Sequence, residues 1–489
     1  MWAFLISAFA YWAILFFLGY MGYKKTLPTA TEYFLAGRAL GPFVIGLAML
    51  ASVQSAWLML GHQGLQYTVG LPYTLYFSHM FVMLFALLTF YRPLWHLSHK
   101  YGYVTVGEAV SDYFGSRIPR ILIAILAIFY GIGYIAIQLV GAGLVFEKFA
   151  GWPFWAGAVA MSIVVGFYVI AGGWRSTAWT DCLQGILLVL GMFLLAGAVL
   201  WHVGGWEVMW DRALKELPAK YFEVPGGAVA WGLPFIFTLT LSTVGIYTSP
   251  QYSMQIFSAK SFKAIRLFVW IVISIACFYY FFNTVVIGMG GRLLFPNLAK
   301  PDMLPVFIAT EKMPLPLGIM YAIGLLAAMN STADIYLLFT SGIIMRDLVM
   351  PLMPTRSIPE KRQVLYTRII GILLIVLTIV MVFWRAAYEY IALFGPLASG
   401  YGLQMVPVLL AMTRTPRITM AGASAGLIAG MIATTLTYYV WMYPLSIHCS
   451  VWGLIFNFIV CAIVSLLTKP PEPDKIKKFH GYLEEVMGK

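Results

Sequence analysis

The sequence predicts an all-α polytopic membrane protein, and both its composition and its hydropathy pattern support this fold class. Of its 489 residues, 61% are apolar and only 10% are charged, with a mean hydropathy of +0.85, whereas soluble domains carry about 25% charged residues. Apolar runs of roughly 20 residues, each long enough to cross about 30 Å of hydrocarbon, recur from end to end. The alternation typical of barrel strands does not occur, so helices in a lipid bilayer are expected.

Thirteen membrane-spanning helices are expected, and an odd number places the two termini on opposite sides. When the loops are assigned alternately, about 23 of the 31 Lys and Arg fall on one side, which the positive-inside rule makes the cytoplasm. The N-terminus is therefore expected outside the cell membrane and the C-terminus inside, and the net charge of +12 needs no nucleic-acid partner. The expected spans are 2–23, 41–65, 70–95, 118–146, 152–172, 176–204, 228–249, 263–290, 315–346, 363–384, 388–412, 418–443 and 447–467.

Two of these spans carry polar interruptions at mid-depth, at 51–57 and at 241–250. The interruptions open two successive five-helix blocks, 41–204 and 228–412, and this topology inverts the second block relative to the first. Paired broken helices at corresponding positions mark the central site of many transporters, although ordinary helices with small packing residues would show the same pattern. The other segments are an N-terminal helix with its loop, an outer loop, two C-terminal helices and a basic tail: 1–40, 205–227, 413–468 and 469–489.

Oxygen-bearing residues cluster in the middle of the span 315–346. Ala328, Ser331 and Thr332 fall at i, i+3 and i+4, so one carbonyl and two hydroxyls share a helix face. Hard cations take oxygen ligands, and an unwound 51–57 segment would add main-chain oxygens of Ala51 and Gln54. The sequence therefore predicts a cation site, with the alternative that the two hydroxyls merely bond back to the preceding turn.

Two carboxylates, Asp181 and Asp334, lie within apolar spans, where an ionisable group is costly and usually functional. Asp334 stands beside the hydroxyl pair. Asp181 lies about one turn from the expected cytoplasmic loop that carries Arg175, so it is either a loop-paired carboxylate or an ion-binding or proton-binding group on an exit path. Gln138 is a further polar residue inside a span, equally suited to contact a substrate or a neighbouring helix.

Four motifs, in the expected order, resemble the sodium:solute symporter family. They occur at 34–38 (FLAGR), 93–105 (PLWH, then KYGYVT), 172–184 (GGW, then TDCLQ) and 328–332. The resemblance extends from near residue 30 to the basic tail. It implies a five-plus-five inverted-repeat core with broken helices, one extra N-terminal helix and two extra C-terminal helices, and sodium-coupled uptake by alternating access.

The same resemblance assigns roles to individual residues. The main sodium site would combine main-chain oxygens of the broken helix with the hydroxyl-bearing face, using Ala51, Gln54, Ala328, Ser331 and Thr332. Members with a second sodium use an aspartate at the position of Asp181 and a polar residue near Asp334. Because Asp334 replaces the serine that is usual there, a second sodium, a proton and neutralisation of a substrate group all stay open.

Three departures from the proline-transporting members bear on the substrate. Val53 stands where those members have an aspartate, and Ser242 and Ile246 stand where they have aromatic residues. The stretches 247–251 and 257–261 look closer to the monocarboxylate and pantothenate branches, so the leading expectation is a small organic acid. Six residues are expected to line its site: Gln54, Ser55, Trp57, Gln138, Thr243 and Tyr247.

Other functions compete with this expectation. The nearest alternatives are a proton-coupled symporter of the same fold and uptake of pantothenate or of an amino acid such as proline, while a channel and a sensory membrane domain are less favoured. The sequence displays no nucleophile–base pair and no metal-ligand cluster, so we expect no enzyme, and sodium as the coupling ion with no cofactor. The sequence leaves open whether a small membrane subunit is needed.

Overall fold

The computed structural model describes residues 1–225, 231–353, 358–383 and 391–488, and it builds them almost entirely from helices. The helix starts expected at 228 and 388, the helix end expected at 384 and the end of the 205–227 loop lie outside the described residues. Within the described part, an isolated bridge between Leu40 and Ala259 is the only strand-like pairing. The all-α prediction is confirmed for these residues.

Ten helices form the first part of the chain. They are α1 (Trp2–Lys25), α2 (Ala30–Leu35), α3 (Pro42–Val53), α4 (His62–Val69), α5 (His79–Ala86), α6 (Arg92–Tyr101), α7 (Val106–Phe114), α8 (Ile118–Ala150), α9 (Phe154–Val203) and α10 (Trp206–Glu216), counted within residues 1–225. Three further helical segments continue these helices. The π-helical turn η2 (Trp57–Gly61) precedes α4, the 3-10 helix η3 (Leu71–Ser78) precedes α5, and the π-helical turn η4 (Leu87–Tyr91) joins α5 to α6.

The second part repeats this pattern of long rods and short connecting helices. Its helices are α11 (Leu233–Ser242), α12 (Val244–Thr248), α13 (Pro250–Ser258), α14 (Phe262–Tyr280), α15 (Gly291–Leu294), α16 (Leu304–Glu311), α17 (Leu315–Ile343), α18 (Met350–Leu352), α19 (Glu360–Phe383), α20 (Ile391–Leu403), α21 (Val406–Thr413), α22 (Met420–Tyr439), α23 (Cys449–Leu467), α24 (Pro473–Ile476) and α25 (Tyr482–Met487). Between them lie η6 (Phe281–Gly290), η7 (Pro301–Met303), η8 (Ile344–Val349) and η11 (Lys477–Gly481).

The length and apolar character of these helices suit a membrane. Among the described residues, eight helices are long and apolar enough to cross a bilayer, or nine when the bent pair Pro42–Val53 and Trp57–Val69 is taken as one span. Three shorter apolar helices, Leu233–Thr248, Thr284–Leu294 and Leu397–Thr413, overlap further expected spans. The count of thirteen therefore stays a prediction.

The two spans expected at 152–172 and 176–204 form one 50-residue element, α9, which changes direction at Gly173. Gly173 has φ +62 and ψ −159, a backbone conformation that is open to glycine and strained for other residues. A Cβ at this position would also stand 2.5 Å from the carbonyl oxygen of Tyr33. The expected break is therefore present as a kink without intervening loop residues.

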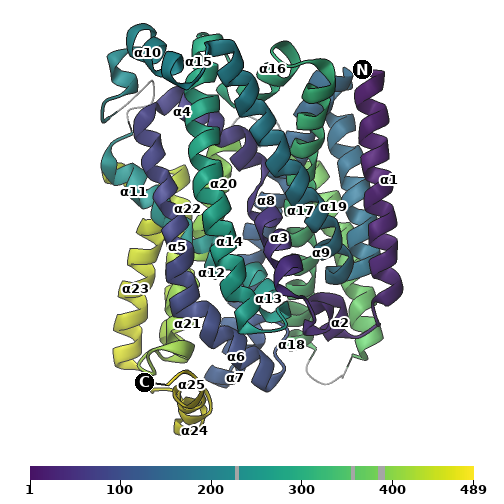
Figure 1. Ribbon diagram of the computed structural model, residues 1–489. Helices are drawn as coiled ribbons and strands as arrows, with labels where there is room; N and C mark the ends of the chain where they lie inside the picture. The colour runs from purple at the N-terminus through teal and green to yellow at the C-terminus, as the bar shows by residue number, and fades with distance from the viewer. Residues whose placement is uncertain (226–230, 354–357, 384–390, 489) are drawn as a thin grey trace.

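Helix α17 runs through the middle of the bundle, and residues 321–343 of this helix are all buried. It packs against α9, α8 and α3, while α1 lies at the rim (Figure 1). The two termini lie at opposite ends of the bundle (Figure 1), as an odd number of spans requires. We call the end that carries α6, α7, α18 and the C-terminal tail the basic end; that it faces the cytoplasm stays a prediction from the charge distribution.

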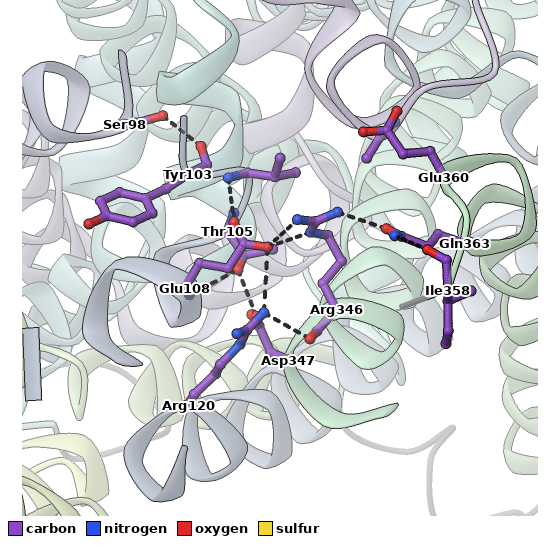
Figure 2. Close-up of polar contacts among 12 residues, drawn as sticks. Ser98, Tyr103, Thr105, Glu108, Arg120, Arg346, Asp347, Ile358, Glu360 and Gln363 are labelled. Carbon is purple, nitrogen blue, oxygen red and sulfur yellow. Dashed lines mark hydrogen bonds and ion pairs between the residues drawn. The ribbon is translucent and has the colours of Figure 1, made fainter. Parts of the chain in front are cut away.

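A partly buried ion-pair network ties four segments together at the basic end (Figure 2). Arg120 of α8 donates from Nε to Asp347 Oδ1 at 2.8 Å and lies 3.4 Å from Glu108 of α7. Arg346 of η8 contacts the same Glu108 oxygen at 2.5 Å and donates to Gln363 of α19 at 2.9 Å. Because these partners are up to 238 residues apart, no local pattern in the sequence predicts the network.

The C-terminal tail is folded against the basic end. Lys475 Nζ lies 2.6 Å from Asp112 Oδ1 of α7, and Lys478 pairs with the second oxygen of the same carboxylate. Phe479 is buried and stacks near Tyr101, whose hydroxyl donates to the Lys478 carbonyl at 2.8 Å. The basic tail expected at 469–489 is thus a packed element of the fold.

Candidate functional site

The first interruption breaks a helix. Helix α3 ends at Val53, the chain resumes helical structure at Trp57, and the two halves are bent by 59°. Gln138 of α8 fills the gap, since its Oε1 accepts a hydrogen bond of 2.7 Å from the Ala56 amide. An amide freed inside a membrane must find such a partner. Gln138 thus makes a contact with a neighbouring helix, which is one of its two expected roles, and its role toward a substrate stays a prediction.

The second interruption also breaks its helix. Helix α11 ends at Ser242, α12 covers one turn, and α13 begins at Pro250. Gly245 lies so close to α20 that an added Cβ would stand 1.8 Å from the Ser399 carbonyl oxygen. The Thr243 hydroxyl bonds back to the Thr240 carbonyl at 2.7 Å. This break therefore packs tightly on α20, with Thr243 satisfied inside its own helix.

The hydroxyl face of α17 meets the end of α3. Ser331 Oγ lies 3.0 Å from the Ala51 carbonyl oxygen, and Thr332 Oγ1 lies 3.3 Å from that of Ser52. Both hydroxyls also lie 3.1 Å from the Ala328 carbonyl oxygen. The bonds to Ala328 are the back-bonding that the alternative interpretation expects, but the contacts with Ala51 and Ser52 join two helices, which back-bonding does not explain.

These oxygens have the chemistry that a hard cation requires of its ligands, and in this structure the two hydroxyls and the two α3 carbonyls are joined by hydrogen bonds. Each of the residues involved contributes a neutral oxygen, and all are buried: Ala51, Ser52, Ala328, Ser331 and Thr332. Oxygens at adjacent positions around one such ion, each about 2.4 Å from it, lie about 3.4 Å apart, and the separations here are 3.0 to 3.3 Å. Four of the five predicted sodium ligands come together: Ala51, Ala328, Ser331 and Thr332.

Gln54 is the fifth predicted ligand, and Ser52 is a residue that the prediction missed. The Gln54 amide donates to the Ala51 carbonyl at 3.1 Å, and no hydrogen bond joins Gln54 to α17 within the described residues. Its side-chain Oε1 is buried and lacks a partner there. Ser52 could have been found from the helix end alone, because the last carbonyls of a broken helix have no partner within the helix.

The two predicted carboxylates meet each other. Asp181 of α9 and Asp334 of α17 are fully buried and close enough to interact electrostatically. The Tyr168 hydroxyl donates to Asp334 Oδ2 at 2.7 Å, whereas neither Asp181 oxygen accepts a hydrogen bond within the described residues. Arg175, the partner that the loop-paired interpretation requires, binds Glu32 at 2.5 Å instead.

A narrow cavity of about 20 Å³ lies beside the break in α3. That is room for about one water. A solute of several heavy atoms can enter only if the surrounding side chains or helices move. Its lining residues are Ser52, Val53, Ser55, Trp57, Leu58, His62, Tyr76, His79, Tyr134, Ile246, Tyr247 and Tyr336.

Three of the six predicted substrate residues line this cavity, namely Ser55, Trp57 and Tyr247. The other three, Gln54, Gln138 and Thr243, are not among its lining residues. The prediction missed His62, His79 and three tyrosines. Helical spacing could have found two of these, since Tyr336 follows Thr332 by four residues and Tyr134 precedes Gln138 by four.

Asp302 lies outside the membrane-spanning helices, in η7, where it packs against α4 in the second half of the broken helix. A Cβ added at Gly64 of α4 would stand 2.1 Å from Asp302 Oδ1, so the carboxyl group touches the α4 backbone. Burial raises the pKa of Asp302 to about 7. This contact links the loop before α16 to the helix that borders the cavity.

The chain is similar to known proteins over most of its length. The model of the sodium:solute symporter family matches residues 33–430. A sodium/proline symporter of Staphylococcus aureus is 25% identical over 502 residues, covering 96% of this chain and 94% of the relative.

Two solved structures share the fold. One is a Na⁺-coupled sialic acid symporter in a substrate-bound outward-open state, with a TM-score of 0.82, 17% identity and coverage of 96% of this chain and 98% of that one. The other is a nucleobase-cation-symport-1 family transporter in a closed conformation with bromovinylhydantoin bound, with a TM-score of 0.51, 16% identity and coverage of 91% and 94%.

Proposed function

This chain belongs to the sodium:solute symporter family, and we propose that it is a secondary active symporter that couples sodium entry to uptake of a small organic solute. The family members and fold neighbours named above are transporters, not enzymes. The observation that carries the proposal is the group of neutral oxygens shared by α17 and the broken end of α3, because it can hold one hard cation.

The position of this group explains how an ion could drive transport. Helix α3 lies in the first predicted repeat, 41–204, and α17 in the second, 228–412. An ion bound between them stabilises every conformation in which the two helices are in contact. Because the same end of α3 borders the cavity through Ser52 and Val53, ion and solute favour the same arrangement and therefore bind cooperatively.

We propose a small monocarboxylate as the solute. Among the described residues, the cavity lining contains no Asp, Glu, Lys or Arg, so a cationic solute would lack a counter-ion there, whereas an anionic one would have the bound sodium nearby. The helix that resumes at Trp57 and continues through α4 directs the N-terminal end of its dipole toward the break, which also favours a carboxylate. Ser55, Trp57 and Tyr247 are the proposed contacts from the predicted set.

An amino acid of the proline type is the second candidate, because curated relatives are sodium/proline symporters. Val53 and Ile246 line the cavity and give it two apolar walls where a proline-type site would have other residues.

Asp181 and Asp334 are proposed to hold a second ion or a proton, and this pair is the observation that favours proton coupling as an alternative. We also propose a location in the cell membrane with the N-terminus outside.

Thermal unfolding of the purified protein tests these proposals. A ligand that binds the native state raises stability by mass action, so monocarboxylates, pantothenate and proline are each added in sodium and in choline buffers. Stabilisation by a monocarboxylate only in sodium supports the proposal. Stabilisation by proline moves the solute to the second candidate, and stabilisation that depends on pH but not on sodium contradicts sodium coupling.

A further inference from the structure

Helix α1 is the extra helix that precedes the two predicted repeats, and one side of it faces away from the protein. Ile6, Phe9 and Phe17 are exposed, as expected for contact with lipid. The opposite side packs on α9 and α17 and carries Tyr11, which is 4% exposed. A helix that only seals the bundle against lipid has no need of a buried hydroxyl at this depth.

The Tyr11 hydroxyl lies between two amide side chains. Gln184 of α9 donates from Nε2 and Asn330 of α17 donates from Nδ2, each at 3.2 Å from the Tyr11 oxygen. Since amide nitrogens only donate, the Tyr11 oxygen accepts both bonds and its own proton is used in neither. Tyr11 therefore holds one amide from each of the two helices in place.

The two amides are on the same helix faces as the two carboxylates. Gln184 follows Asp181 by three residues, and Asn330 precedes Asp334 by four, so each helix presents one amide and one carboxyl together. Tyr11 interacts electrostatically with both carboxyl groups. The five side chains thus form one polar layer between α1, α9 and α17.

This layer contains more acceptors than donors. Gln184 Oε1, Asn330 Oδ1, Asp334 Oδ1 and both Asp181 oxygens are buried and accept no hydrogen bond within the described residues. Leaving such atoms without a partner costs free energy for each of them. A proton shared by the carboxyl pair would still leave both amide oxygens without a partner, whereas one hard cation satisfies several oxygens together.

We propose that Tyr11, Gln184 and Asn330 complete a second sodium site with the carboxyl pair, so that helix α1 is part of the coupling machinery. Tyr11 is a positioning residue, because it fixes the amides whose oxygens share the polar layer with the carboxyl groups. The inference rests on the proposed function, in which Asp181 and Asp334 bind an ion.

The test measures the sodium response that remains when the main site is weakened. In full-length protein carrying Ser331→Ala, which weakens the main site, sodium is titrated against the thermal unfolding midpoint at constant ionic strength in choline. Adding Tyr11→Phe is expected to weaken the remaining sodium response about tenfold or more. Asn330→Leu is expected to do the same from a different helix, so a folding defect of one variant does not decide the result.

Tyr20→Phe is the matched control, since Tyr20 is on the same helix and is 54% exposed; its sodium response should stay unchanged. An unchanged response in both Tyr11→Phe and Asn330→Leu overturns the inference, as does a remaining response that follows pH and not sodium. If the unmodified protein shows no sodium response at all, the proposed function itself fails. If it does respond and Ser331→Ala weakens that response while Tyr11→Phe does not, only this inference fails.

Discussion

Removing a single hydroxyl from the α17 face is expected to weaken sodium binding without unfolding the protein. Ser331→Ala deletes the oxygen that lies 3.0 Å from the Ala51 carbonyl, and Thr332→Val deletes the one that lies 3.3 Å from the Ser52 carbonyl while keeping the shape of the side chain. Contacts of a neutral polar group with a charge contribute about 1.5 to 3 kcal/mol. Each variant should therefore raise the sodium concentration for half-maximal response about tenfold to hundredfold.

The two losses should not add. Both hydroxyls share the Ala328 carbonyl oxygen, and residues with a shared partner show coupling in double-mutant cycles. The double variant is thus expected to lose less affinity than the product of the two single effects. Thr332→Ser, which keeps the hydroxyl, should stay within about threefold of the unmodified protein, since a few tenths of a kcal/mol is the usual effect of a change that keeps the contact.

The assay is a sodium titration of the thermal midpoint, repeated as sodium-dependent uptake into vesicles. Ser341→Ala is the control, because Ser341 lies on the same helix, is buried, and within the described part of the chain bonds only back to the Leu338 carbonyl at 2.8 Å. Its sodium response should match that of the unmodified protein. The reasoning is refuted if Ser331→Ala and Thr332→Val behave like Ser341→Ala, since the hydroxyls would then be ordinary back-bonded residues.

Three further predictions concern the surroundings of the site. Gln138→Leu leaves the Ala56 amide without its partner and should lower the free energy of unfolding by about 1 to 3 kcal/mol, measured by thermal or denaturant unfolding; a neutral effect would mean that another group satisfies the amide. Burial raises the pKa of Asp302 to about 7, so between about pH 4 and pH 7 the native state binds more protons than the unfolded state. The free energy of unfolding should therefore fall as pH rises from about 4 to about 7, by at most about 4 kcal/mol. Asp302→Asn should abolish this dependence of the free energy of unfolding on pH. Partial burial opposes ionisation of Asp112, but hydrogen bonds led by the one from Lys475 outweigh it and lower the pKa of Asp112 to about 2. Asp112→Asn should therefore release the tail at neutral pH, which would be measured as faster hydrogen exchange in 473–487. In the unmodified protein the contact should weaken only as pH falls toward 2.

Local pattern accounts for most of the elements. Apolar runs long enough for a bilayer predicted the helices, and polar residues inside two such runs predicted the breaks after Val53 and Ser242. Helical spacing placed Ser331 and Thr332 on one face. These features follow from interactions within one turn of the chain, so periodicity is sufficient to detect them.

The tertiary structure decided what each polar residue contacts. Gln138 fits a substrate site and a helix contact equally well in the sequence, and only the tertiary structure shows that it accepts a hydrogen bond from the Ala56 amide at the break. Tyr11 shows no signal within its apolar span, and Arg120 shows none for Asp347, 227 residues away. Hydrogen-bond partners separated by hundreds of residues depend on how whole helices pack, and a one-dimensional pattern carries no information about that packing.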